Sequence, residues 1–280
     1  MILIADSGST KTDWCLTASE AVSQRMSTQG VNPFFQTDEQ ICGILHDELL
    51  PQILSSSVGL ISEVHFYGAG IRPEMRERMK GILSEAFPKA KIEVESDLLG
   101  AARALFGHGE GIACILGTGS NSGLYDGQTI IANTPPLGFI LGDEGSGAVL
   151  GKLFLGSLCK GLMPNGLLEE YLTETQQKIS DVIQAVYRQP LPNRYLARTS
   201  RFIHSHIHVE EVRKLVVDNF RAFFRRNIVQ YGRHDLPVRA IGSVAWFYQE
   251  QLKEAAQQEG FLVDQVLQSP MEGLVRFVSL

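Results

Sequence analysis

The sequence predicts an α/β protein made of two related lobes, residues 1–110 and 111–280. Short apolar strands alternate with amphipathic helices along the chain, which is typical of this fold class. A pattern of apolar strand, Gly/Ser/Thr loop and second strand occurs twice, as ILIADSGSTKTDWCL from residue 2 and as ACILGTGSNSGLYDG from residue 113. The repeat indicates a duplicated lobe, although degenerate repeats also arise by chance. The glycine-rich stretch Gly107–Gly111 is the expected boundary.

In the first lobe, strands are expected where apolar residues run together or alternate, and helices where they recur every three or four positions. Ser96 is a candidate N-cap for one helix, and Pro73 opens another. The expected strands are residues 2–5, 12–17, 63–67 and 91–95, and the expected helices are residues 39–54, 73–86 and 98–106.

In the second lobe, Asp126-Gly127 is a hairpin turn signal. The acidic residues after Gly142 predict a helix start there, since acids are favoured in a first helical turn. The expected strands are residues 112–116, 121–125, 128–132, 238–241 and 261–267, and the further helices are residues 168–188, 209–230, 244–258 and 269–277.

Composition narrows the class of partner. The chain has 280 residues, of which 44% are hydrophobic and 20% charged, so a packed core is expected. A net charge of −6 argues against nucleic acid or an anionic membrane as the main partner. The sequence shows no secretory signal, and no apolar run approaches the roughly 18 residues that a membrane span needs. The four cysteines form no CxxC pair. A cytoplasmic protein is therefore expected. Its reduced thiols are Cys15, Cys42, Cys114 and Cys159.

The two Gly/Ser/Thr loops are candidate phosphate-binding sites. Small residues leave backbone N–H groups and hydroxyls open to phosphate oxygens. Each loop leads into a strand, which distinguishes it from the Walker loop and from the dinucleotide fingerprint, since both of these open a helix. Either loop alone could be a simple hairpin turn; two copies make the phosphate interpretation stronger.

Three aspartates are candidates for chemistry. Asp6 follows the first strand, where a carboxylate could hold a hydrated magnesium ion beside phosphates. Asp97 and Asp143 stand near expected helix starts, so an ordinary capping role is the alternative for both. The glycines around Asp143 favour a ligand, because they carry an entropic cost that close approach to a ligand would explain.

Four segments, DSGSTKTD, ILGTGSNS, LGDEGSG and AIGSVA, resemble in order and spacing the motifs of the N-acetylglucosamine kinases in the BadF/BadG/BcrA/BcrD family. This resemblance extends over nearly the whole chain. It implies two actin-like (ribonuclease H-like) lobes with a ligand cleft between them and the terminal helix packed back on the first lobe. It also implies a kinase that uses ATP and Mg2+ to phosphorylate N-acetylglucosamine at its 6-hydroxyl. The sequence does not set the oligomeric state, and a homodimer is one possibility.

The resemblance also assigns residues. Asp97 would be the general base, and Asp6 would hold magnesium through water. The implied nucleotide-binding residues are Asp6, Ser7, Gly8, Ser9, Thr10, Lys11, Gly117, Thr118, Gly119, Gly242 and Ser243. The implied sugar-binding residues are Asn32, Asp97, Ser120, Asn121, Gly138 and Asp143.

One segment departs from the family pattern, and two other functions are possible. Pro135–Phe139 reads PPLGF where relatives have a GGWGH-like segment that lines the sugar pocket, so sugar preference is open. An ATPase activator of acyl-CoA dehydratases shares the superfamily but needs clustered cysteines, and Cys114 has none nearby in the sequence. A non-catalytic sugar sensor is the third possibility, and the presence of both Asp97 and Asp143 argues against it.

Overall fold

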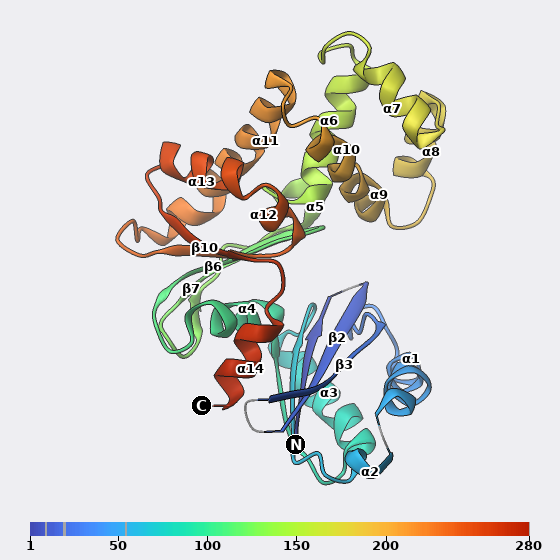
Figure 1. Ribbon diagram of the computed structural model, residues 1–280, viewed down its shortest axis with the longest axis vertical. Helices are drawn as coiled ribbons and strands as arrows, with labels where there is room; N and C mark the ends of the chain where they lie inside the picture. The colour runs from blue at the N-terminus through green and yellow to red at the C-terminus, as the bar shows by residue number, and fades with distance from the viewer. Residues whose placement is uncertain (9, 19–20, 54, 280) are drawn as a thin grey trace. The chain divides into compact units, whose positions relative to one another are not determined.

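The computed structural model describes residues 1–8, 10–18, 21–53 and 55–279 (Figure 1). The chain forms two compact units, of which the first contains residues 1–109, 126–130 and 269–280 and the second contains residues 110–125 and 131–268. Each unit has its own five-stranded sheet and its own buried apolar core. The α/β architecture predicted from the sequence is confirmed.

The first sheet has the strand order β3-β2-β1-β4-β5. Strands β1 and β2 pair antiparallel around the first loop, and β4 and β5 run parallel to β1. Alternation along β1 sends Leu3 and Ala5 into the core that α1 and α3 cover, whereas buried Ile4 belongs to the opposite face. The strands are β1 (Ile2–Ser7), β2 (Lys11–Ala18), β3 (Ala21–Gln29), β4 (Glu63–Gly68) and β5 (Lys91–Ser96).

The helices of this unit include a continuous helical run where one helix was predicted for residues 39–54. Thr37 caps its start in a capping box with Gln40, and the run changes from α to π to 3₁₀ geometry. Helix α14 packs against α4, and the two lie side by side in Figure 1. The elements are α1 (Asp38–Gly43), η1 (Ile44–Leu49), η2 (Leu50–Gln52), α2 (Ser55–Val58), α3 (Pro73–Ala86), α4 (Asp97–Phe106) and α14 (Met271–Ser279).

The second sheet repeats this topology. Its order is β10-β9-β6-β7-β8, with β6 and β7 antiparallel around the second loop and β9 and β10 parallel to β6. The repeated strand-loop-strand pattern therefore occupies the same place in both sheets. The strands are β6 (Gly111–Leu116), β7 (Ser120–Tyr125), β8 (Ile130–Ala132), β9 (Val238–Ile241) and β10 (Val263–Leu267).

Three helix predictions for the second unit are wrong. The helix expected over residues 244–258 is two helices, because Tyr248 leaves helical geometry (φ −113°, ψ 28°) between them. Residues 168–188 form two helices, because Gln176 takes a left-handed conformation (φ 53°) that ends the first. The helix expected from Gly142 begins at Gly147, and Ser146 caps it by accepting the N–H of Val149 at 3.1 Å. The elements are α5 (Gly138–Leu141), α6 (Gly147–Cys159), α7 (Leu167–Thr175), α8 (Ile179–Tyr187), α9 (Pro192–Arg198), α10 (Ser200–Ser205), α11 (Glu210–Phe223), η3 (Phe224–Ile228), η4 (Val229–Tyr231), α12 (Ser243–Phe247) and α13 (Gln249–Gln258).

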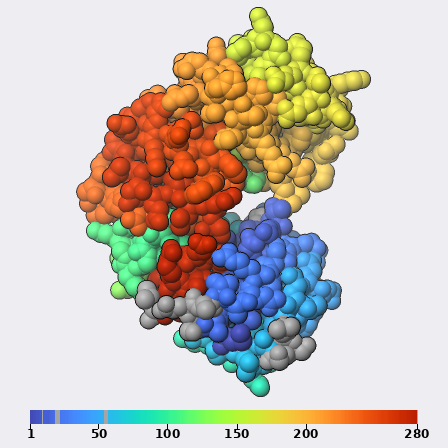
Figure 2. All heavy atoms as spheres, in the orientation of Figure 1, coloured from blue at the N-terminus to red at the C-terminus, as the bar shows by residue number. Residues whose placement is uncertain are grey.

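The helices of the second unit share one large core with its sheet. Phe154, Phe202 and Phe220 are buried in it. Figure 2 shows α7 and α8, in yellow, at one end of this unit. In the part of the chain that the structure describes, all four cysteines are free, and no helix has the length and apolar character that a membrane span requires.

Candidate functional site

The first loop is a tight turn between β1 and β2. The N–H of Gly8 donates to the carbonyl of Lys11 at 3.0 Å, and the exposed Lys11 ammonium lies 2.6 Å from the Asp13 carboxylate. Thr10 is exposed, and Ser9 lies outside the described residues. The turn therefore presents backbone and small side chains at the end of β1, as the phosphate-loop hypothesis requires.

Ser7 has a structural role within this loop. Its hydroxyl is buried, lies 2.6 Å from that of Thr12 and donates to the carbonyl of Val31 at 2.9 Å. The N–H of Val31 donates back to the Ser7 oxygen at 3.1 Å. These contacts tie the loop to the segment after β3.

An acidic cluster lies at the carboxyl edge of the first sheet. In the parallel register Ser7, Gly68 and Ser96 are neighbours, so Asp6 and Asp97 reach the same edge. Burial, together with the negative charges of Asp97 and Asp13, raises the pKa of Asp6 to about 7, and the positive charge of Lys11 opposes this rise. Asp6 therefore keeps its proton to a higher pH than an ordinary aspartate does.

Asp13 was not assigned a role from the sequence. It is the last residue of DSGSTKTD and pairs directly with Asp6 across the hairpin. The signal was available, because a hairpin that pairs Ser7 with Thr12 must also pair Asp6 with Asp13, one residue further from the turn.

Asp97 is the first residue of α4, but Ser96 is the residue that caps this helix. The Ser96 hydroxyl accepts the N–H of Leu99 at 3.2 Å, as predicted. One Asp97 oxygen accepts the N–H of Leu98 at 2.8 Å. Burial raises the pKa of Asp97, and the backbone N–H groups partly offset this. A carboxylate that is not needed as the cap is available for chemistry.

Asn32 lies beside the turn that follows β4. Its Oδ1 accepts the N–H of Phe34 at 3.1 Å. Gly70 has a left-handed φ of 77°, and a Cβ there would lie 2.2 Å from that oxygen, so the close approach requires glycine. Asn32 is thus held near the carboxyl edge that carries Asp6 and Asp97.

The second loop is fixed to the start of α6. The N–H of Gly117 donates to the carbonyl of Gly119 at 2.9 Å. The first amides of α6, those of Gly147 and Ala148, donate to the carbonyls of Gly117 and Thr118 at 2.8 and 3.1 Å. The helix therefore supports the loop from behind and orders it before any ligand arrives.

Gly242 and Ser243 meet this loop at the carboxyl edge of the second sheet. Strands β6 and β9 are parallel neighbours, so their ends lie together. Gly242 has φ 123°, and a Cβ on it would lie 2.4 Å from the Leu116 carbonyl oxygen and 3.4 Å from the Gly117 nitrogen. Only glycine fits here, and the turn brings Ser243 to the loop.

Asp143 contacts two other predicted sugar-binding residues, Ser120 and Gly138. Its carboxylate accepts the backbone N–H groups of Ser120 and Gly138, and its own N–H donates to the Pro136 carbonyl at 2.8 Å. Burial, with a contribution from Glu144, raises the pKa of Asp143 to about 6 despite these hydrogen bonds.

Asn121, predicted to bind sugar, lies next in β7. Its Oδ1 accepts the N–H of Ser122 and the Nδ2–H of Asn133, both at 2.9 Å. Asn133 has no signal in the sequence motifs, because it comes from the loop after β8.

The segment Gly142–Ser146 is a loop, held from α11 and η3. Asp143 and Gly145 both have left-handed φ values, 55° and 79°. Asn219 accepts the N–H of Gly145 at 3.1 Å, and Arg226 forms an ion pair with Glu144 at 3.0 Å. These supporting residues were not predicted from the sequence.

The acidic cluster fits a hydrated cation better than a direct metal site. Asp6, Asp13 and Asp97 combine negative charge, and a pKa raised to about 7 for Asp6 shows that a nearby positive charge would be favourable. Among the described residues, however, no three His, Cys, Asp or Glu side chains gather closely enough to hold a metal directly. Magnesium keeps several waters when bound beside phosphates, so Asp6 can act through water.

Comparison with known proteins places this site in context. No protein-family model and no curated protein matches the sequence. Among solved structures, a proposed N-acetylglucosamine kinase of Porphyromonas gingivalis is 51% identical, with a TM-score of 0.97 over 100% of this chain and 99% of that one. A second proposed N-acetylglucosamine kinase, from Chromobacterium violaceum, is 16% identical with a TM-score of 0.76, covering 99% of this chain and 98% of that one.

A third solved structure carries ligands. It is a ROK-family glucokinase of Streptomyces griseus in complex with glucose and AMPPNP, 15% identical, with a TM-score of 0.56 over 99% of this chain and 97% of that one. At this identity the likeness shows the fold alone.

Proposed function

Because the chain belongs to the N-acetylglucosamine kinase-like group of the BadF/BadG/BcrA/BcrD family and is an ATP-dependent sugar kinase, we propose that it phosphorylates N-acetylglucosamine at the 6-hydroxyl. The proposal of this acceptor is supported by the 51% identity, over the whole chain, to the protein of Porphyromonas gingivalis. The observation that supports the chemistry is the placement of Asp97 beside Asp6 at one sheet edge, with Ser96 serving as the helix cap.

Asp97 acts as the general base in this proposal. A sugar hydroxyl is a weak nucleophile at neutral pH, and a carboxylate that accepts its proton accelerates transfer by about 10²- to 10⁴-fold. The hydroxyl oxygen forms a bond to the γ-phosphorus, the bond from that phosphorus to the ADP oxygen breaks, and the proton goes to Asp97. The raised pKa of Asp97 suits this role, because a more basic carboxylate holds the proton better.

The two loops bind the phosphates of ATP in this proposal. Gly8, Thr10 and Lys11 contribute from the first unit, and Thr118 and Gly119 contribute from the second, while Gly242-Ser243 supports the adenosine. Phosphoryl transfer asks a protein mainly for positioning and charge neutralisation, which backbone N–H groups and Lys11 supply. Magnesium, when bound, would neutralise phosphate charge, and Asp6 with Asp13 would hold its water shell.

The proposed sugar-binding residues all carry polar groups. Asn32 and Asp97 contribute from the first unit, and Ser120, Asn121 and Asp143 contribute from the second. As an ionised carboxylate, Asp143 accepts hydrogen bonds from sugar hydroxyls, and the backbone N–H of Gly138 fixes its orientation.

The activator function is less well supported. Cys114 is buried in β6, and burial raises the pKa of its thiol far above the ordinary value. A thiol without access to its thiolate form is poorly suited to bind an iron–sulfur cluster at a subunit interface.

A coupled ADP-release assay over N-acetylglucosamine, glucosamine, N-acetylmuramic acid and glucose tests the proposal. N-acetylglucosamine is expected to give the highest kcat/KM, with release dependent on magnesium. ADP release that does not depend on any sugar would contradict the proposal, and a higher kcat/KM for another sugar would replace the acceptor.

A further inference from the structure

The loop after Asn32 presents two aromatic side chains on the surface of the first unit. Phe34 is 46% exposed and Phe35 is 77% exposed, and their rings meet edge to face with centroids 4.9 Å apart. Single exposed apolar residues are ordinary, but a pair of aromatic rings beside a polar site is a recurrent feature of ligand-binding surfaces.

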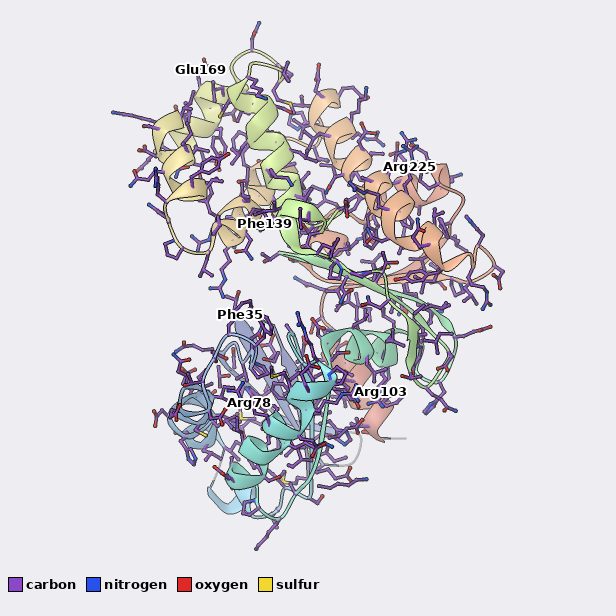
Figure 3. The ribbon with its side chains drawn as sticks, turned by 180° about the vertical axis from the view of Figure 1, so that it is seen from behind. Phe35, Arg78, Arg103, Phe139, Glu169 and Arg225 are labelled. Carbon is purple, nitrogen blue, oxygen red and sulfur yellow. The ribbon has the colours of Figure 1, made fainter. Side chains whose placement is uncertain are left out.

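The loop is held firmly by helix α3. Arg78 donates to the carbonyl of Pro33 at 2.6 Å and to that of Gln36 at 2.8 Å, and its Nε donates to Asp38 at 2.5 Å. Arg78 and Phe35 are labelled in Figure 3. An arginine that satisfies two backbone carbonyls and a carboxylate at once fixes the shape of the loop.

Further contacts fix Phe34 but leave Phe35 at the surface. The Arg72 guanidinium lies over the Phe34 ring, 4.5 Å from its centroid. The N–H groups of Phe35 and Gln36 both donate to the Asn32 carbonyl at 3.1 Å. The backbone of Phe35 is therefore ordered by hydrogen bonds, and its ring lies against Phe34, which Arg72 holds in place. Because this segment is already ordered, the loop loses little conformational entropy when a ligand covers the ring.

The position of this loop indicates what covers the ring. Asn32 is at the start of the loop and lies against the Gly70 turn, at the carboxyl edge that carries Asp6 and Asp97. A sugar held by Asn32 through its hydroxyls has an apolar face of carbon-bound hydrogens, and N-acetylglucosamine has an acetyl methyl group as well. Aromatic rings pack favourably against such apolar surfaces.

We infer that Phe35 is a specificity-determining contact for the sugar substrate, with its ring packed against the apolar surface of the bound sugar. This inference rests on the proposed function and adds to it a residue that discriminates among acceptors. The ring packs either against the pyranose face, which all sugars in the panel share, or against the N-acetyl methyl group, which glucosamine lacks.

The test compares Phe35→Ala with wild type in the ADP-release assay, with N-acetylglucosamine and glucosamine as acceptors. Loss of the ring should raise the sugar KM about tenfold, with the KM for ATP and the kcat little changed, since the contact exists in both ground and transition states. Phe35→Tyr keeps the ring and should restore the wild-type KM. A rise for both sugars would assign the contact to the pyranose face, and a rise for N-acetylglucosamine alone would assign it to the acetyl group.

Leu60→Ala is the matched control. Leu60 is 63% exposed in the same unit but precedes β4, at the amino edge of the sheet, and should leave every kinetic constant unchanged. The melting temperature of Phe35→Ala should also stay unchanged, because its ring is mostly exposed already.

An unchanged sugar KM in Phe35→Ala, with wild type active on sugars, would overturn this inference and leave the proposed function standing. A lower melting temperature together with equal losses in kcat and in the KM for ATP would also overturn it, because that result indicates a structural role. Wild type inactive on every sugar would contradict the proposed function and this inference together.

Discussion

Replacing Asp6 with Asn is expected to stabilise the metal-free protein at alkaline pH while removing its magnesium-dependent activity. Burial and the neighbouring charges of Asp97 and Asp13 raise the pKa of Asp6 to about 7. Asn has nearly the same size and carries no charge, so it removes the repulsion without opening a cavity. A site that destabilises its own fold in this way is a common compromise between stability and function.

The magnitude follows from the pKa. A tenfold change in proton affinity is worth about 1.4 kcal/mol, so a rise from 3.8 to about 7 destabilises the folded state by about 4 kcal/mol at pH 8. The unfolded chain loses this proton near pH 4, whereas the folded chain keeps it to about pH 7. The free energy of unfolding of wild type should therefore decline relative to Asp6→Asn as pH rises from about 4 to 7, and the difference should then level off.

Urea denaturation of both proteins between pH 4.5 and 8.5, in the presence of a chelator, measures this difference. Magnesium added at pH 8 should stabilise wild type and have little effect on Asp6→Asn, because the cation relieves the repulsion only where the carboxylate is present. Asp126→Asn is the matched control. Asp126 is exposed and accepts the N–H groups of Thr129 and Gln128, which lower its pKa. It is therefore ionised in both the folded and the unfolded chain above pH 4.5, so the stability curve of Asp126→Asn should stay parallel to that of wild type across this range.

Parallel stability curves for wild type and Asp6→Asn across this pH range would refute the reasoning. That result would mean that Asp6 is ionised throughout and that the acidic cluster is already neutralised within the protein. Full magnesium-dependent turnover by Asp6→Asn would separately remove Asp6 from the metal site.

Three further predictions concern other parts of the site. Asp97→Asn should lower kcat by about 10²- to 10⁴-fold with ATP affinity little changed, because Asn cannot accept the proton; a near-normal kcat would move the base role elsewhere, with Asp143 the next candidate. Gly242→Ala should lower the free energy of unfolding by about 1–3 kcal/mol through backbone strain and by more through the clash with Leu116, and it should weaken ATP binding. Gly232→Ala, whose added Cβ meets open space, should lower the free energy of unfolding less when both variants are measured by calorimetry. Equal losses of stability in the two variants would contradict this account. The sugar KM should rise as pH falls through about 6, where Asp143 becomes protonated; a pH-rate profile unaffected by Asp143→Asn would refute this.

Much of the fold could be predicted because local signals agreed with the tertiary structure. The repeated strand-loop-strand pattern predicted two sheets of like topology, and Ser96 was identified as a cap from residue type alone. The errors come from backbone conformation that periodicity does not encode. Apolar spacing continues across Gln176, where a left-handed residue ends α7. The acidic residues after Gly142 are typical of a first helical turn, but the left-handed backbone conformation of Asp143 places them in a loop.

The candidate site divides in the same way. The residues in sequential motifs, such as Asp6 and Asp97, could be identified because the ends of parallel strands meet at one edge. The residues that support those motifs could not be identified, because they come from distant elements. Arg226 reaches Glu144 from η3, and Arg78 reaches the loop after Asn32 from α3. Only tertiary packing brings these side chains to their partners.

Identification of the product tests the central claim most directly. Wild-type protein is incubated with ATP, magnesium and N-acetylglucosamine, and the sugar is analysed by phosphorus and proton NMR. We expect one equivalent of ADP for each phosphorylated sugar, with the phosphate on the 6-oxygen, and formation of both products slowed by about 10²- to 10⁴-fold in Asp97→Asn. Free inorganic phosphate with an unmodified sugar, or phosphate on another hydroxyl, would contradict the account.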